Sequence, residues 1–258
     1  MGLPIKPSVE ERPGIDQQTL LAALRARVAR LEGGGRETHG AAPIPVCDGL
    51  GLPGDGLARA ALHEVLAAEP GCGAAFAAVL LGRTGGTVLW IAAGADALTA
   101  WPPGLARFGL LPANLILLRA EHWSDALWAM EEALRCPAVA GALLAPDWSG
   151  DPAAHAPDLT ASRRLQLAAE AGGGIGLLLR PDPHIKTGAN PPASAAASRW
   201  RIAAHNSAGA GQGMGDPCWR LELLRLRGGR PGGPWTVTWR AAAGRIDREA
   251  EGMAAESA

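Results

Sequence analysis

One junction in the sequence has the spacing of a nucleotide-binding loop but lacks the residue types that hold a nucleotide. It runs from Ala68 to Ala75, with the sequence Ala-Glu-Pro-Gly-Cys-Gly-Ala-Ala, between a predicted strand and a predicted helix. A loop of the form G-x-x-x-x-G-K-[ST] places its Lys on the phosphates and its Ser or Thr on Mg²⁺. Here Ala68 replaces the first Gly, and Ala74 and Ala75 replace the cation and the metal ligand. Because Gly71 and Gly73 remain, we expect the loop skeleton to survive without bound nucleotide, cofactor or metal.

Two further positions point the same way. A catalytic acid after the second core strand would fall within Ile91-Ala-Ala-Gly94, which contains no carboxylate. An Asp that orients magnesium would fall at Ala145, and Asp147, two residues later, is typical of a turn. Four losses together predict a protein that is not an enzyme, with a residual ATP-binding protein as an alternative.

Other chemical motifs are incomplete. His63-Glu64 begins like the H-E-x-x-H zinc motif, but Ala67 stands where the second His is needed. Ser162 has no G-x-S-x-G context, so we expect it on a helix surface rather than as a nucleophile. The four cysteines have no C-x-x-C spacing, which predicts reduced thiols rather than a zinc site or a disulfide framework; they are Cys47, Cys72, Cys136 and Cys218.

The composition is that of a globular protein. Of 258 residues, 48% are hydrophobic and 19% charged, and the net charge of −1 gives no reason to expect nucleic acid or a membrane as partner. The first residues carry charge and proline where a secretory signal needs an apolar core, and the longest apolar runs are too short to cross a bilayer. We therefore expect a cytoplasmic protein.

The hydrophobic pattern predicts an α/β domain. Short apolar runs alternate with helical stretches, which indicates a doubly wound, mainly parallel sheet. The predicted strands are 61–66, 87–92, 115–119, 140–144 and 176–179. The predicted helices are 73–81, 103–108, 124–135 (with Ser124 as a possible cap) and 159–171. Residues 182–198 are predicted to form an exposed loop, and 219–225 and 235–240 alternate apolar and polar residues around a Gly-rich turn, which predicts a C-terminal antiparallel hairpin.

These expectations divide the chain into three parts. Residues 1–40 are predicted to form an N-terminal helix and a flexible linker, 41–240 the α/β domain, and 241–258 a polar tail that forms a frayed helix. The N-terminal helix carries an apolar stripe that either packs on its own domain or faces a partner. The stripe consists of Leu21, Leu24, Val28 and Leu31.

Tryptophan and arginine supply the remaining candidates for binding. Trp90, Trp123 and Trp128 lie in apolar stretches and are predicted to be core residues. Residues 199–240 hold seven arginines against two acids, together with four tryptophans, so this region could contact DNA, form a protein interface, or be a sheet edge with Trp inside and Arg outside. Arg163-Arg164 could contact a partner or form an ordinary salt bridge. The hairpin candidates for partner binding are Trp219, Arg220, Arg225, Arg227 and Trp235.

Several longer stretches carry a family resemblance. They include Asp125-Ala-Leu-Trp-Ala-Met-Glu-Glu-Ala-Leu-Arg135, Leu159-Thr-Ala-Ser-Arg-Arg-Leu-Gln-Leu-Ala-Ala-Glu170 and Trp219-Arg-Leu-Glu-Leu-Leu-Arg-Leu-Arg-Gly-Gly-Arg-Pro231. Together with Gly49–Val65 and Gly176–Pro181, they span residues 45–240 and resemble the ImuA family, RecA-like accessory proteins of bacterial damage-induced mutagenesis.

The resemblance implies a RecA-like fold and a role in SOS-induced translesion DNA synthesis. It implies an ImuB-like protein, RecA and an error-prone DNA polymerase complex as partners, bound by a domain that mimics a recombinase subunit. The family's distant similarity to SulA keeps a cell division inhibitor that binds the division GTPase as a second alternative. No catalytic residues follow from the resemblance.

Overall fold

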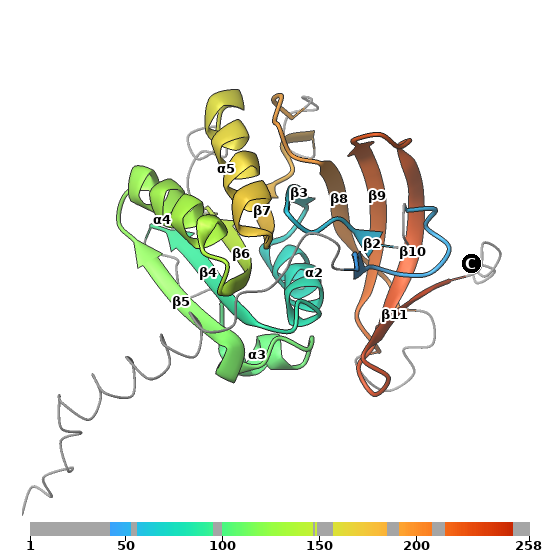
Figure 1. The fold of residues 1–258 in the computed structure, drawn as a ribbon. Coiled ribbons are helices and arrows are strands. Elements are labelled where there is room, and N and C mark those ends of the chain that lie inside the picture. The colour runs from blue at the N-terminus through green and yellow to red at the C-terminus, as the bar shows by residue number, and fades with distance from the viewer. Residues whose placement is uncertain are drawn as a thin grey trace, which may run out of the picture. The chain divides into compact units, whose positions relative to one another are not determined.

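A computed structural model describes residues 42–52, 56–94, 100–146, 148, 157–184, 191–207 and 215–249. Within these ranges the main feature is a nine-stranded sheet in the order β11-β10-β9-β8-β3-β7-β6-β4-β5 (Figure 1). Its strands are β3 (Ala61–Ala67), β4 (Thr87–Ala93), β5 (Leu115–Ala120), β6 (Val139–Ala145), β7 (Ile175–Pro181), β8 (Ser198–His205), β9 (Cys218–Leu226), β10 (Gly232–Arg240) and β11 (Arg245–Arg248). A separate two-stranded sheet pairs β1 (Ile44–Pro45) with β2 (Gly56–Leu57).

The pairing of neighbouring strands changes once across the large sheet, from parallel to antiparallel. The strands from β5 to β8 are parallel, and β8, β9, β10 and β11 then pair antiparallel in succession. Strands β7 and β6 lie between β3 and β4, so strands that follow one another in the sequence are not always neighbours in the sheet. The predicted doubly wound sheet with a C-terminal antiparallel hairpin is therefore confirmed.

Helices cover both faces of the sheet. On one face, α2 (Pro70–Gly82) and α3 (Pro102–Ala106) belong to a core that also contains Phe76, Trp200 and Trp219. On the other face, α4 (Trp123–Arg135) and α5 (Leu159–Gly172) lie side by side over a second core that contains Met130 (Figure 1). A short 3-10 helix, η3 (Pro112–Asn114), leads into the edge strand β5.

The structure corrects four predictions. Residues 198–205 form β8, and the first three of them are buried. The exposed loop predicted for 182–198 therefore ends before residue 198. Residues 245–248 add β11 to the sheet instead of continuing a frayed helix, because they pair with residues 237–240 of β10. Helix α4 begins one residue early after His122, and Ser124 bonds to Asp125 instead of capping the helix. Helix α2 begins three residues earlier than predicted, at Pro70.

Candidate functional site

The early start of α2 removes the loop that a phosphate would need. Strand β3 ends at Ala67 and α2 begins at Pro70, so only Ala68 and Glu69 connect them. Gly71 and Gly73 lie in the first turn of the helix, where the expected loop skeleton is absent. The prediction that the loop skeleton survives is wrong, because Pro70 starts the helix directly after Glu69. The fixed φ of Pro suits the first helical position.

Close packing holds this helix start against the sheet. A Cβ built at Gly73 would lie 2.6 Å from the Cβ of Ala67 and 2.6 Å from Cδ1 of Leu179 on β7. Real Cβ atoms do not approach neighbours so closely, so position 73 must be Gly for α2 to rest on β3 and β7 at this distance. The glycine that the motif suggested for phosphate binding therefore serves helix–sheet packing.

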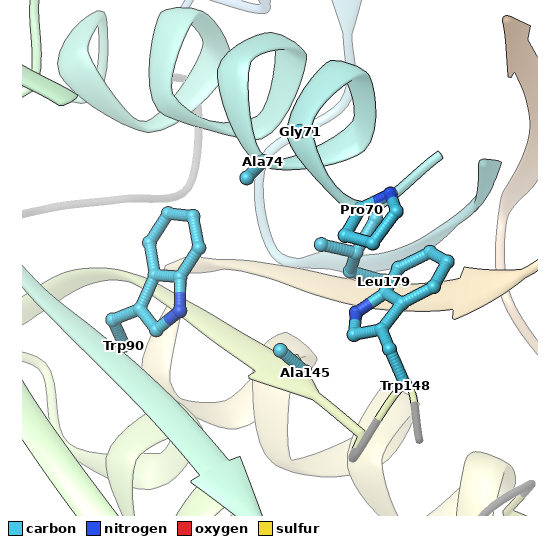
Figure 2. A pocket seen from close by; sticks show the side chains of 7 residues that line it. All are labelled: Pro70, Gly71, Ala74, Trp90, Ala145, Trp148 and Leu179. Carbon is cyan, nitrogen blue, oxygen red and sulfur yellow. The ribbon is translucent and has the colours of Figure 1, made fainter. Parts of the chain in front are cut away.

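An apolar pocket of about 210 Å³ occupies the space beside this helix start (Figure 2). It lies where the first turn of α2 meets the carboxyl ends of parallel strands, which is the usual place for a ligand in open α/β sheets. Among the residues that the structure describes, its lining holds no charged side chain and consists of Pro70, Gly71, Ala74, Trp90, Ala145, Trp148 and Leu179.

The residues expected to mark the lost ATP site fall on or near this pocket. Ala74 and Ala145 line it, and Ala75 is buried in α2. The backbone N–H of Gly94 donates to the carbonyl of Ala120 on the neighbouring edge strand (3.0 Å). Asp147 lies outside the described residues. Where these positions are described, the pocket offers indole rings and methyl groups in place of a cation and carboxylates.

Three charged residues on the neighbouring strands β3, β7 and β8 form a buried cluster. Glu64 is fully buried and accepts hydrogen bonds from Nε of Arg199 (2.6 Å), from the hydroxyl of Ser194 (3.0 Å) and from Arg180. A buried carboxylate needs such partners because desolvating an unpaired charge is costly. The Glu of the His63-Glu64 pair is thus committed to an internal ion pair, and the structure gives it no access to solvent.

His63 makes two hydrogen bonds of its own. Its Nε2 lies 2.8 Å from the carbonyl oxygen of Ala58 and its Nδ1 lies 2.7 Å from Oγ of Ser198. A carbonyl can only accept, so Nε2 carries the proton and the neutral ring accepts the Ser198 hydroxyl at Nδ1. Burial lowers the pKa of His63 to about 4. Although this resembles a Ser–His catalytic pair, Ser198 is fully buried and also accepts from Nε1 of Trp200 (2.9 Å).

Within the described residues, no group of three or more His, Cys, Asp and Glu side chains could hold a metal ion. The cysteines are free thiols, and only Cys136 is exposed. Ser162 is buried rather than exposed as predicted, because its hydroxyl donates to the carbonyl of Leu159 (3.0 Å) and accepts the N–H of Ala195 (3.0 Å).

The outer side of α4 and α5 carries exposed apolar residues that the sequence did not predict. Trp128 is 64% exposed and Leu167 on α5 is 53% exposed. A groove of about 290 Å³ runs between the helices, lined by Ser124, Leu127, Trp128, Glu131, Ala161, Arg164 and Leu165. Trp128 was predicted to be core and is not, since the helix buries positions 126, 129, 130, 133 and 134 and turns position 128 outward. That helical spacing was the signal that could have identified it.

The Arg163-Arg164 pair divides between two roles. Arg164 forms an ion pair with Glu131, whose carboxylate also accepts from Arg135, so these three side chains join α4 to α5. Arg163 is exposed next to this groove. The pair therefore supplies one structural salt bridge and one surface charge.

The C-terminal hairpin, β9 and β10, is mostly packed within the sheet, and β11 forms the edge beyond it. Trp219 is buried, with its ring 6.1 Å from those of Phe76 and Phe108, and Trp235 lies against buried Trp200 at 6.5 Å. Trp219 is therefore wrong as a surface contact, because its ring belongs to the core. Among the arginines, Arg225 donates to the carbonyl of Ala196, Arg227 pairs with Glu170 at 3.7 Å, and Arg220 is exposed.

The predicted N-terminal stripe, Leu21, Leu24, Val28 and Leu31, lies outside the described residues. Within the described residues, no helix is long and apolar enough to cross a membrane.

Comparison with known proteins places this geometry in a family. No protein-family model matches the sequence. The chain is 42% identical over 204 residues to Protein ImuA of Caulobacter vibrioides (strain NA1000 / CB15N), covering 73% of this chain and 79% of that protein. It is 35% identical over 121 residues to the cell division inhibitor SulA of Edwardsiella piscicida, covering 46% of this chain and 64% of that protein.

Among solved structures, the RadB recombinase superposes with a TM-score of 0.55 at 12% sequence identity, covering 74% of this chain and 92% of that chain. At this identity the likeness shows the fold alone, which is RecA-like. With a RecA-like fold and this degree of identity over most of a curated relative, the chain belongs to the ImuA family.

Proposed function

We propose that this chain is a cytoplasmic, non-catalytic accessory protein of damage-induced mutagenesis that acts by binding other proteins. The family supports the damage-induced role, and the RecA-like fold supports a domain that presents the shape of a recombinase subunit. Its proposed partners are an ImuB-like protein and RecA, within a complex that contains an error-prone DNA polymerase and carries out SOS-induced translesion synthesis.

The observation that carries the non-catalytic part is the two-residue connection between β3 and α2. Such a short turn leaves too little backbone to surround a phosphate chain, and Ala74 and Ala75 supply neither cation nor metal ligand. Isothermal titration of the full chain with MgATP tests it. We expect no binding tighter than millimolar, and a micromolar Kd would overturn the proposal.

The surface we assign to partner binding is the outer side of α4 and α5. Exposed Trp128 lines a groove in which the Arg164–Glu131 ion pair connects the two helices, and Leu167 is exposed on α5. Trp is prominent among the residues that dominate binding energy at protein interfaces, and Arg163 supplies charge at the rim. An apolar groove on a rigid helix pair suits an apolar segment of an ImuB-like protein better than it suits the phosphate backbone of DNA.

The partner is tested by purifying the tagged protein from its own host after DNA damage and identifying bound proteins by mass spectrometry. An ImuB-like protein or RecA is the expected result. Recovery of neither, with the protein folded and expressed, would contradict the proposed role.

The likeness to SulA favours one second candidate, inhibition of cell division. Such an inhibitor would bind the division GTPase and block its polymerisation. An assembly assay with the purified GTPase separates the two candidates: we expect polymerisation to proceed unchanged at equimolar protein, and an arrest would favour the second.

A further inference from the structure

The indole nitrogen of Trp90 is buried without a hydrogen-bond partner among the described residues. The residue is 2% exposed. An indole N–H can only donate, and leaving a buried donor unpaired costs about 1–3 kcal/mol. Such a group in an otherwise apolar wall indicates that the pocket receives an acceptor.

Figure 2 shows where this nitrogen points. It lies on the side of the Trp90 ring that faces Ala145 and Trp148, and the nitrogen of Trp148 is turned toward the same space from the other side. Both rings therefore present their electropositive edges, not their faces, to the pocket.

The start of α2 lies beside the same pocket, because Pro70 and Gly71 line it. Pro70 has no N–H, and the N–H groups of Gly71 and Cys72 precede the first bond within the helix, from Gly73 to the carbonyl of Glu69. The positive end of the helix favours an electron-rich atom near it.

The described part of the lining favours a neutral ligand. The side chains of Ala74, Ala145 and Leu179 are apolar, and the described lining residues include no cation. A carboxylate or phosphate would lose its hydration without gaining a counter-charge, which is costly. A pocket of about 210 Å³ also suits a molecule smaller than a typical drug.

We propose that this pocket binds a small, uncharged and largely apolar molecule with one carbonyl oxygen, which accepts the hydrogen bond from Nε1 of Trp90. The apolar body of the ligand packs on Leu179 and Ala74. The assignment is independent of the proposed function, since it rests on the pocket and not on the α4–α5 surface.

Two probes of similar size test it on the ¹⁵N-labelled full chain. Benzamide carries the carbonyl, and ethylbenzene lacks it. The indole N–H signal of Trp90 is identified as the one missing in Trp90→Phe, and the signal missing in Trp128→Phe serves as a control on the outer surface. We expect benzamide to move the Trp90 signal downfield in a saturable manner, while ethylbenzene produces no downfield shift and the Trp128 signal stays still.

The substitution gives a second readout. Because Phe keeps the flat ring and removes the donor, Trp90→Phe should weaken benzamide binding about fivefold and leave ethylbenzene binding unchanged. If the Trp90 signal does not shift with benzamide, or shifts equally with both probes, the assignment is overturned. If Trp90→Phe does not fold, the Trp90 signal is assigned from three-dimensional spectra of the native chain labelled with ¹³C and ¹⁵N, and the comparison of the two probes on that chain decides.

Discussion

Gly73 lies so close to Leu179 that a Cβ at position 73 would come within 2.6 Å of Leu179 Cδ1. The contact joins the first turn of α2 to β7 and leaves Ala68 and Glu69 as the whole connection from β3. The proposed loss of the nucleotide site therefore has two causes, the lost side chains and a changed backbone. Restoring the side chains addresses only the first.

The double variant Ala74→Lys, Ala75→Ser should consequently gain no MgATP affinity. The new Lys would project into the apolar pocket from a helix whose start lacks the surrounding loop, so its charge would not meet a held phosphate. Titration calorimetry beside the native chain checks this. A micromolar Kd in the variant would show that the loop geometry had survived.

Gly73→Ala should destabilise the protein by about 1–3 kcal/mol, since the added methyl must displace Ala67 or Leu179. Gly71 is the matched control: it lies in the same helical turn, and a Cβ there would meet nothing within 4 Å. Gly71→Ala should be neutral or stabilise by up to about 1 kcal/mol through helix propensity. Urea unfolding of both variants measures the difference, and equal effects would refute the packing role of Gly73.

His63 should make stability depend on pH. Its pKa is lowered from 6.5 to about 4 by burial, so between these values the unfolded chain binds a proton that the folded chain does not. The free energy of unfolding should thus be retained above about pH 6.5 and fall as the pH drops toward 4, by at most about 3 kcal/mol from this residue. His63→Gln removes the titrating group. Unfolding curves across this range should show a shallower pH dependence in the variant, and an identical slope would contradict the assignment.

Glu64→Gln should cost about 3–5 kcal/mol, because it leaves Arg180 and Arg199 buried without a counter-charge. Glu132→Gln is the control, since that carboxylate is half exposed and pairs with Arg135 on the surface of α4. It should change stability by less than about 1 kcal/mol. Chemical denaturation compares the two. A mild effect at Glu64 would mean that the cluster is hydrated in solution.

The strands of the parallel core could be predicted from the sequence because each is a continuous apolar run with the length of a strand in a buried sheet. Strand β8 could not, since Ser198, Arg199 and Arg201 look like loop residues until Glu64, on another strand, provides the buried partner that makes Arg199 possible. Strand β11 is held by its pairing with β10, a contact that no local pattern contains.

The candidate site was predictable in part. The sequence shows directly that Ala74 and Ala75 stand where a nucleotide-binding loop has its Lys and its Ser or Thr. The early start of α2 at Pro70 could have been inferred, because Pro is favoured at the first helical position. The indole-lined pocket could not, since it joins Trp90 in the middle of β4 to Trp148 after the end of β6, and only the folded sheet brings them together.

The most direct test of the account concerns the outer side of α4 and α5. Trp128→Ser removes the exposed indole from this surface, and Trp101→Ser removes one that is 69% exposed at the start of α3, which packs on the opposite face of the sheet. Both variants should unfold at the same temperature as the native protein, because each side chain lies largely in water. After DNA damage, tagged Trp128→Ser should recover at least tenfold less ImuB-like protein or RecA than the native chain, while Trp101→Ser recovers the native amount. Equal recovery by Trp128→Ser and the native chain would contradict the proposal that this surface binds the partner.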